Sequence, residues 1–264
     1  MPAFTAQDVK RLRDATGAGM MDAKRALTET DGDFEAAAKW LREKGLGKMA
    51  QRRGENVDGA VALAQSGNVA ALVELKSETD FVAKSPDFVN VANDLAQLVV
   101  DKGEDAVKEK LDVIDDLRVS LKENVELGRV VRFEAAEGNV LDSYLHVQSD
   151  RGKNGVLVEV GGGGQQVAHD IAVHIAFARP RYLSRDDVPE EEVESERSVI
   201  AALARNEGKP EQALPKIVEG RLSAYFKERC LLEQPFVKDE KRTIAQLLGQ
   251  AVVVRFAQLE IGAA

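Results

Sequence analysis

Hydrophobic and polar residues are arranged in three different ways along the chain. Residues 5–44 carry apolar side chains at helical spacing, which predicts three short helices packed on one another. Residues 57–178 alternate short apolar runs, typical of buried strands, with longer helical stretches. Residues 186–229 carry thin apolar stripes on both sides of a Gly-Pro turn and predict an antiparallel helical hairpin. Residues 230–264 return to the core, with a closing strand over 252–259.

The first forty residues predict a helical bundle. Its first helix should start at a capping box of Thr5 and Asp8, and its third helix should end at Gly45. The residues expected to face inward on the second helix, over 20–30, are Met20, Ala23 and Leu27. A bundle of about forty residues has a small core and is marginally stable alone.

The strand-and-helix pattern of the middle region occurs twice. Residues 72–75 (Leu-Val-Glu-Leu) match residues 157–160 (Leu-Val-Glu-Val), 85 positions further on. The helical segment 91–96 matches 167–172, only 76 positions further on. The sequence therefore predicts a duplicated α/β core with small antiparallel sheets, in which the first copy has nine more residues between strand and helix than the second.

The additional residues of the first copy include Thr79-Asp80-Phe81. This run follows a predicted strand and precedes Ser85-Pro86, a typical helix start. Phe81 could fold back to plug the core, as large apolar side chains usually do, or point outward to a partner. The second copy closes the same connection with six residues, so the longer connection favours a functional addition.

Composition restricts the classes of protein to consider. There is one cysteine, Cys230, and no apolar run near the roughly 18 residues of a membrane span, and the first residues lack a signal pattern, so a soluble cytoplasmic protein is expected. The net charge of −9 argues against nonspecific binding to nucleic acid. Residues 1–53, however, hold eleven Lys or Arg against eight acids, an asymmetry that suits contacts to different faces of a partner.

Motifs for catalysis and for metal or cofactor binding are missing. The glycines at 161–164 are not followed by the Gly-Lys-Ser/Thr of a phosphate loop. His169 and His174 are five apart and miss the spacing that puts two metal ligands on one helix face. We expect neither catalytic chemistry nor a cofactor or metal site.

Two segments resemble the signatures of the bacterial translation elongation factor Ts family. One runs from Leu12-Arg13 through the run from Thr16 to Leu27; the other is Glu78-Thr79-Asp80-Phe81. Lys76-Ser77 departs from the Asn-Cys that the family often has, and the chain ends soon after Ile261, where longer members carry a further helical module. The resemblance implies that residues 1–53 form a ubiquitin-associated (UBA)-like bundle with linker, and that the hairpin is a coiled coil.

The resemblance also implies a function, guanine-nucleotide exchange on GDP-bound elongation factor Tu. The residues expected to contact the partner are Thr79, Asp80, Phe81 and Val82 for displacement of its magnesium, and Lys10, Leu12, Arg13, Met20 and His146 elsewhere. The alternative from another class is a non-catalytic module that binds a partner through bundle and hairpin. Self-association through the hairpin stays open.

The expected domains follow the same divisions. After the bundle, residues 54–140 are expected to form the first core subdomain and 141–185 the second. The hairpin at 186–229 is inserted into the second subdomain, which residues 230–264 complete. The fold class expected is therefore α+β.

Overall fold

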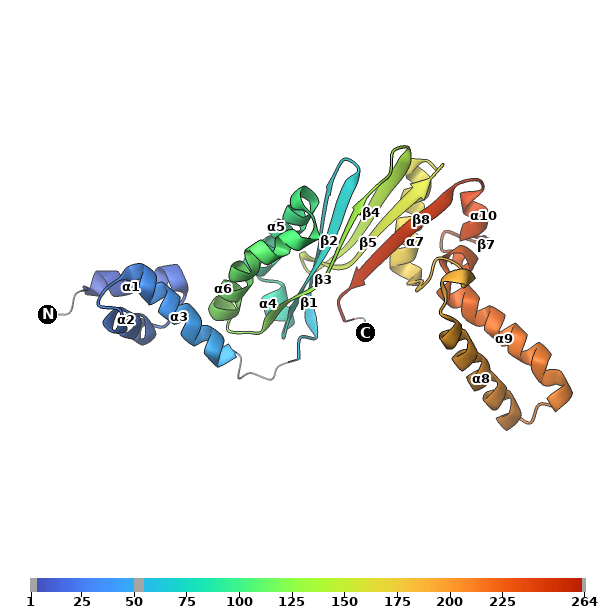
Figure 1. Cartoon of the computed structure of the whole chain (residues 1–264), viewed down its shortest axis with the longest axis horizontal. Helices are drawn as coiled ribbons and strands as arrows, with labels where there is room; N and C mark the ends of the chain where they lie inside the picture. The colour runs from blue at the N-terminus through green and yellow to red at the C-terminus, as the bar shows by residue number, and fades with distance from the viewer. Residues whose placement is uncertain (1–3, 50–54, 263–264) are drawn as a thin grey trace.

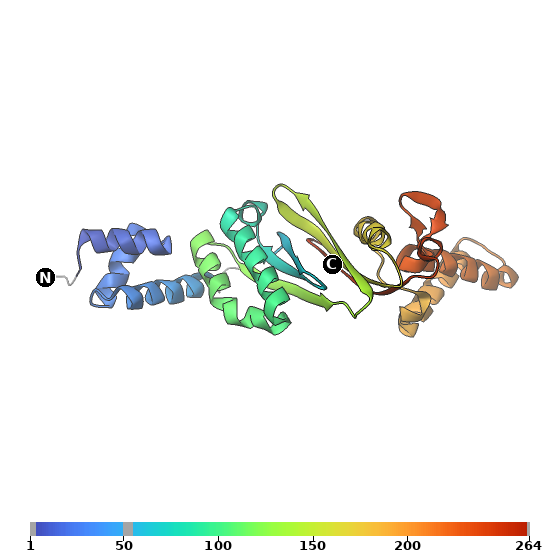
Figure 2. The same ribbon diagram turned by 90° about the horizontal axis from the view of Figure 1, so that it is seen from above.

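The structure is a computed structural model that describes residues 4–49 and 55–262. Helices at the two ends flank a central part built from antiparallel strands. The chain is elongated, with the amino-terminal helices at one end and a projecting pair of helices at the other (Figures 1 and 2). This mixture of helices and small antiparallel sheets agrees with the expected α+β class.

Three helices form the amino-terminal bundle: α1 (Ala6–Thr16), α2 (Met20–Glu29) and α3 (Phe34–Met49). The predicted capping box is present, because the Thr5 hydroxyl accepts from the Asp8 N–H and the Thr5 N–H donates to the Asp8 carboxylate. The buried residues of this bundle form a core of their own: Val9, Leu12, Ala23, Ala26, Leu27, Ala37 and Leu41.

Two expectations for the bundle were wrong. Met20 is 49% exposed, because it is the first residue of α2 and the face further along, at Ala23 and Leu27, covers the core. The third helix does not end at Gly45 but continues to Met49. A Cβ at Gly45 would lie 2.7 Å from the Val119 side chain, so this glycine allows close packing.

Two three-stranded sheets form the centre. In each sheet, two strands form a hairpin, and a third strand pairs with the second strand of that hairpin. The first contains β1 (Asp58–Ser66), β2 (Val69–Ser77) and β3 (Val125–Glu134). The second contains β4 (Asn139–Gln148), β5 (Arg151–Gly161) and β8 (Val252–Glu260). All neighbouring strands are antiparallel and the strand orders correspond, so the predicted duplication is confirmed in the topology.

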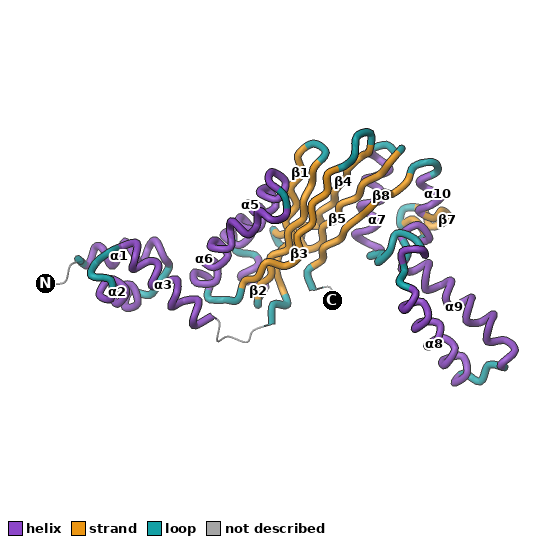
Figure 3. The backbone as a smooth tube through the Cα atoms, viewed as in Figure 1, coloured by secondary structure: helices purple, strands orange, loops and turns teal. Residues whose placement is uncertain are grey.

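The central part is layered helix, sheet, sheet, helix (Figure 3). Val73 and Leu75 face the helices α5 (Pro86–Lys102) and α6 (Leu111–Leu121), which the short 3₁₀ segment η1 (Glu104–Lys110) connects. Leu72 and Leu157 share a second apolar cluster between the two sheets. On the far side, Val156 and Val158 pack with α7 (Gln165–Ala178). This alternation follows the two-residue period of strands buried on both faces.

The projecting helices are α8 (Glu190–Asn206) and α9 (Leu214–Arg229), with 3₁₀ turns η2 (Arg185–Asp187) and η3 (Glu211–Ala213) before each. The spacing of Val193, Ile200 and Leu203 in the sequence predicts one inward face for α8. Ile200 and Leu222 are indeed buried between the two helices, but Leu203 is half exposed. Ala204, the next residue, is buried instead. The face of α8 that packs against α9 therefore includes the small side chain of Ala204 and not the larger one of Leu203.

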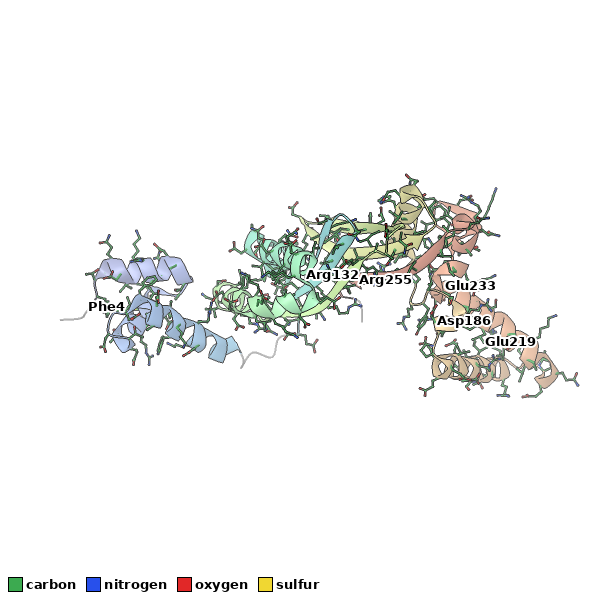
Figure 4. The ribbon with its side chains drawn as sticks, turned by 45° about the horizontal axis from the view of Figure 1, so that its top comes forward. Phe4, Arg132, Asp186, Glu219, Glu233 and Arg255 are labelled. Carbon is green, nitrogen blue, oxygen red and sulfur yellow. The ribbon has the colours of Figure 1, made fainter. Side chains whose placement is uncertain are left out.

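Ion pairs accompany the helical pair along its length. Arg185 pairs with Glu233 near its base, and Arg197 of α8 pairs with Glu219 of α9. Figure 4 labels Asp186 and Glu233 near the base and Glu219 further along α9. These pairs are partly exposed, so screening by water and salt keeps their contribution to stability small.

The carboxyl-terminal part contains a two-stranded sheet that the sequence pattern did not indicate. After η4 (Leu231–Glu233), the strands β6 (Pro235–Phe236) and β7 (Asp239–Thr243) pair, and α10 (Ile244–Leu248) follows. β6 is too short for a period to be read from it. Among the described residues, no helix is long and apolar enough to cross a bilayer.

Candidate functional site

The site begins at Phe81, which lies on a one-turn helix rather than on an open loop. This helix, α4 (Asp80–Ala83), stands between β2 and α5. Thr79 is its N-cap, and the Thr79 hydroxyl accepts a hydrogen bond from the Val82 N–H at 3.4 Å. One turn of helix is too short to be stable by itself, so contacts with the rest of the protein must hold it.

The connection between α6 and β3 holds the start of the turn. The Thr79 hydroxyl donates to Glu123 Oε1 at 2.6 Å, and the Thr79 N–H donates to Glu123 Oε2 at 3.1 Å. The neighbouring Asn124 N–H donates to the Glu78 carboxylate at 2.8 Å. Bonds to an ionised carboxylate are the stronger kind, so Thr79 is tightly positioned.

The turn has an inner and an outer face. Val82 and Ala83 are buried in the cluster that also contains Phe88, whereas 84% of Phe81 is exposed. Phe81 is therefore not a core plug in the free protein. Val82 was expected to contact the partner, but its burial makes it an anchor for the turn, because an i, i+1 pair on one turn cannot face the same side.

Asp80 is partly exposed and forms an ion pair with Lys84, one turn further on. The hydrogen bond from Lys84 lowers the pKa of the Asp80 carboxyl group below its ordinary value. Asp80 thus carries its negative charge at neutral pH, beside the exposed ring.

The candidate residues of the amino-terminal bundle also divide into exposed and buried ones. Lys10, Arg13 and Met20 are exposed. Leu12 is completely buried in the bundle core of the free protein, and its expected contact with a partner stays a prediction. Met21, which the sequence reasoning missed, is 75% exposed. Successive residues of a helix point to different sides, so Met21 could not share the inward face expected for Met20.

His146 is exposed on β4 and lines a surface groove of about 630 Å³. Tyr144 and Phe177 line the same groove, and Phe177 is 72% exposed. Phe177 was also missed. The sequence does contain a sign of its exposure: Phe177 lies two residues after Ile175, a position outside the apolar stripe of α7.

The structure brings some of these residues together and leaves others apart. Arg151, at the start of β5, donates to the backbone carbonyl of Asp80, so the β4–β5 hairpin that carries His146 meets the Phe81 turn. The bundle with Lys10 and Arg13 lies towards one end of the elongated chain, away from this junction (Figure 1). Within residues 4–49 and 55–262 there is no cluster of three or more His, Cys, Asp or Glu that could bind a metal ion.

Comparisons with known proteins agree with the signatures. A family model described as Elongation factor TS matches residues 78–263. The chain is 47% identical to elongation factor Ts of Acidothermus cellulolyticus, over 99% of each chain. It is 47% identical to elongation factor Ts of Thermobifida fusca and 46% identical to that of Mycobacterium avium, over 100% of each chain.

Proposed function

Because the chain belongs to the elongation factor Ts family, we propose that it is a guanine-nucleotide exchange factor that binds GDP-loaded elongation factor Tu and promotes release of GDP. The observation that carries the proposal is the exposed Phe81 on an anchored turn, inside a family signature. An exposed aromatic ring whose backbone is already held loses little entropy on binding.

The proposed mechanism is displacement rather than catalysis. Phe81 inserts between two helices of the partner's nucleotide-binding domain and shifts the groups around its magnesium ion. Magnesium requires near-ideal octahedral geometry, so a small shift weakens binding of the ion and of GDP. The factor needs no catalytic residue, cofactor or metal of its own for this role, and no contact with nucleic acid or membrane.

The other exposed candidates extend the proposed contact. Lys10, Arg13 and Met20 of the bundle touch the nucleotide-binding domain near its phosphate loop, and His146 contacts a different part of the partner. Leu12 and Val82 support these contacts from inside, because both are buried. We further propose that the bundle is of the UBA type, that α8 and α9 form a coiled coil, that the domains divide as expected from the sequence, and that the protein acts in the cytoplasm.

The test is release of labelled GDP from elongation factor Tu, with and without this protein. Acceleration is expected at substoichiometric amounts of factor, since nucleotide displaces the factor after each turnover. A complex that forms without acceleration would leave the alternative, a binding module that does not alter its partner's ligand. Light scattering of the free protein measures self-association.

A further inference from the structure

Arg151 is a buried cation that joins the two halves of the central part. It is the first residue of β5, and only 3% of its surface is exposed. One terminal nitrogen, Nη1, donates to the backbone carbonyl of Asp80 at 2.8 Å. The other, Nη2, donates to the Asp58 carboxylate at 2.9 Å. A side chain of the second sheet thereby holds the first residue of α4, which follows the first sheet.

Two glycines make this reach possible. A Cβ at Gly152 would lie 2.1 Å from the backbone oxygen of Val61, and a Cβ at Gly155 would lie 2.7 Å from the Leu72 side chain. β5 therefore passes closer to the first sheet than side chains at these positions would permit. This close approach lets the guanidinium of Arg151 cross from one sheet to the other.

The hydrogen bonds of Arg151 offset the cost of burying its charge. A buried charge is costly unless it is paired and hydrogen-bonded. Arg151 Nε has no hydrogen-bond partner in the described part of the chain, so the bonds to Asp58 and Asp80 carry the compensation. Asp58 also accepts from Lys153 at 2.7 Å. Within the described part of the chain Lys153 makes no hydrogen bond to α4, so it serves as a matched comparison.

We propose that Arg151 is the positioning residue for Phe81, holding α4 so that the ring stays outward and ready to insert. The inference rests on the proposed exchange function and deepens it. Without a bond to the Asp80 carbonyl, the remaining anchors would leave this one-turn helix more mobile, and its exposed ring could fold onto nearby apolar surface. Thr79 is held by Glu123 at the start of the turn, Val82 packs below it, and Arg151 secures it from the second sheet.

The first measurement is amide hydrogen exchange of the free protein, which does not depend on any partner. Arg151→Met should speed exchange at residues 81–84 by about tenfold or more, as expected for the loss of a bond from a charged donor. Exchange at Leu72 and Val73, in the core of β2, should stay near the parent value. Lys153→Met should leave residues 81–84 unchanged. Unchanged exchange at 81–84 in Arg151→Met would overturn the proposal.

The second measurement is a double-mutant cycle on GDP release at saturating factor. Arg151→Met should slow the maximal rate by about tenfold in the parent chain, and should have almost no further effect in a Phe81→Ala chain, because it acts through that ring. Equal fold losses in both backgrounds would show that Arg151 acts independently of Phe81 and would refute the positioning role.

A third variant covers the case in which Arg151→Met does not fold. Arg151→Lys keeps the charge beside Asp58 but, having a single nitrogen, cannot hold Asp58 and Asp80 in the same geometry. It should fold and show the same local exchange increase and the same non-additivity with Phe81→Ala. If the parent protein itself fails to accelerate GDP release, the proposed function falls, while the hydrogen exchange result still decides whether Arg151 holds the turn.

Discussion

At the scale of single residues, neighbours on one short turn have opposite environments. Phe81 is exposed while Val82, the next residue, is packed in the core of the first sheet. The same separation occurs at Leu12 and Arg13 in α1. Within each motif, therefore, some residues are exposed and can touch a partner, while their neighbours are buried and hold them in place.

Replacing the exposed ring should separate stability from exchange. Phe81→Ala should cost the free protein far less than the roughly 3–5 kcal/mol of a buried Phe→Ala change. The ring can contribute roughly 1.5–3 kcal/mol to the complex, and only the part gained in the nucleotide-releasing state drives exchange. GDP release should therefore slow by about tenfold or more while binding persists. Thermal melts and release rates measure the two effects.

The matched control for this prediction is Phe88→Ala. Phe88 is completely buried in the same cluster as Val82, so its truncation should show the full destabilisation. A Phe81→Ala protein that melts as low as Phe88→Ala, or one that exchanges nucleotide at the parent rate, would contradict the outward role of the ring.

His174 should make stability depend on mild acid. The ring is buried in α7; the Val237 N–H donates to Nδ1, and Nε2 donates to the Gln234 side-chain oxygen at 3.0 Å. Burial lowers the pKa of His174 below its ordinary 6.5. As pH falls, the unfolded chain takes up the proton first, so stability is full above pH about 6.5 and declines towards the lower folded pKa.

The measurement is urea unfolding between pH 7.5 and 5.5. The parent chain should lose stability over this interval by at most about 1.4 kcal/mol per pH unit from His174. His174→Gln, which cannot titrate, should flatten the slope even if its overall stability is lower. An equally steep slope in His174→Gln would assign the acid sensitivity to other groups.

At the scale of elements, the bundle and the helical pair each have an apolar core separate from the central sheets. The bundle meets the centre where α3 passes α6, through the Arg42–Asp116 ion pair and the close approach of Gly45 to Val119. The helical pair leaves and rejoins the chain at one place, since Tyr182 and Cys230 form a β-bridge. Both arrangements predict separability.

Removing residues 1–53 should leave the cooperative melt of the remaining chain nearly unchanged. The Arg42–Asp116 pair is partly exposed and contributes under about 1 kcal/mol. The factor should nevertheless accelerate GDP release less, because Lys10, Arg13 and Met20 are lost. Calorimetry and release rates test both halves, with Asp116→Asn in the full chain as the control for the ion pair alone. A broad melt or collapse of the shortened chain would show that the bundle is integral to the fold.

Replacing residues 186–229 with a short Gly-Ser link should preserve the central fold. The segment's ends are held together independently, since the Leu231 N–H donates to the Tyr182 carbonyl and the Leu232 N–H donates to the Leu183 carbonyl, each near 3 Å. The change removes Tyr225 and Phe226 from their cluster but leaves the cluster around α7 intact. Circular dichroism and solubility are the measurements. An insoluble product would contradict the prediction, and light scattering of both proteins shows whether the hairpin drives self-association.

At the scale of the whole molecule, the exposed candidates are spread along an elongated chain (Figure 1). The bundle carries Lys10 and Met20, the junction of the two sheets carries Phe81, and β4 carries His146. Such spacing suits a factor that holds a large partner at several places and strains it at one. In the proposed mechanism, binding at the outer places supplies affinity, whereas strain at Phe81 supplies exchange.

Reciprocity between factor and nucleotide provides the test at this scale. If the factor weakens GDP binding to elongation factor Tu by some ratio, GDP must weaken binding of the factor by the same ratio. Calorimetric titrations can measure the dissociation constant of the factor with and without GDP, and that of GDP with and without the factor. The two ratios of dissociation constants should be equal and well above one. Equal affinity of the factor for GDP-bound and nucleotide-free partner would contradict an exchange role and favour the binding module.

The sequence by itself determined the order and type of most elements. The capping box at Thr5, the helix start at Ser85-Pro86 and the strands of both repeats were predicted, because caps and apolar periods act within a few residues. The nine-residue surplus of the first copy also located the segment that presents Phe81. Local chemistry is enough for these features.

The tertiary structure decided which face of each element is covered and what holds the site. The apolar spacing of α8 placed Leu203 inward, but it is half exposed, because one turn of periodicity does not say which side chains the neighbouring helix covers. Leu12 and Val82, expected at a partner from the resemblance, are buried in the free protein. Gly45 continues a helix because Val119, far along the chain, needs the space beside it. Arg151 reaches Asp80 across 71 positions of sequence, through a crossing of two sheets. No local pattern encodes such a contact, because it exists only once the two halves have packed.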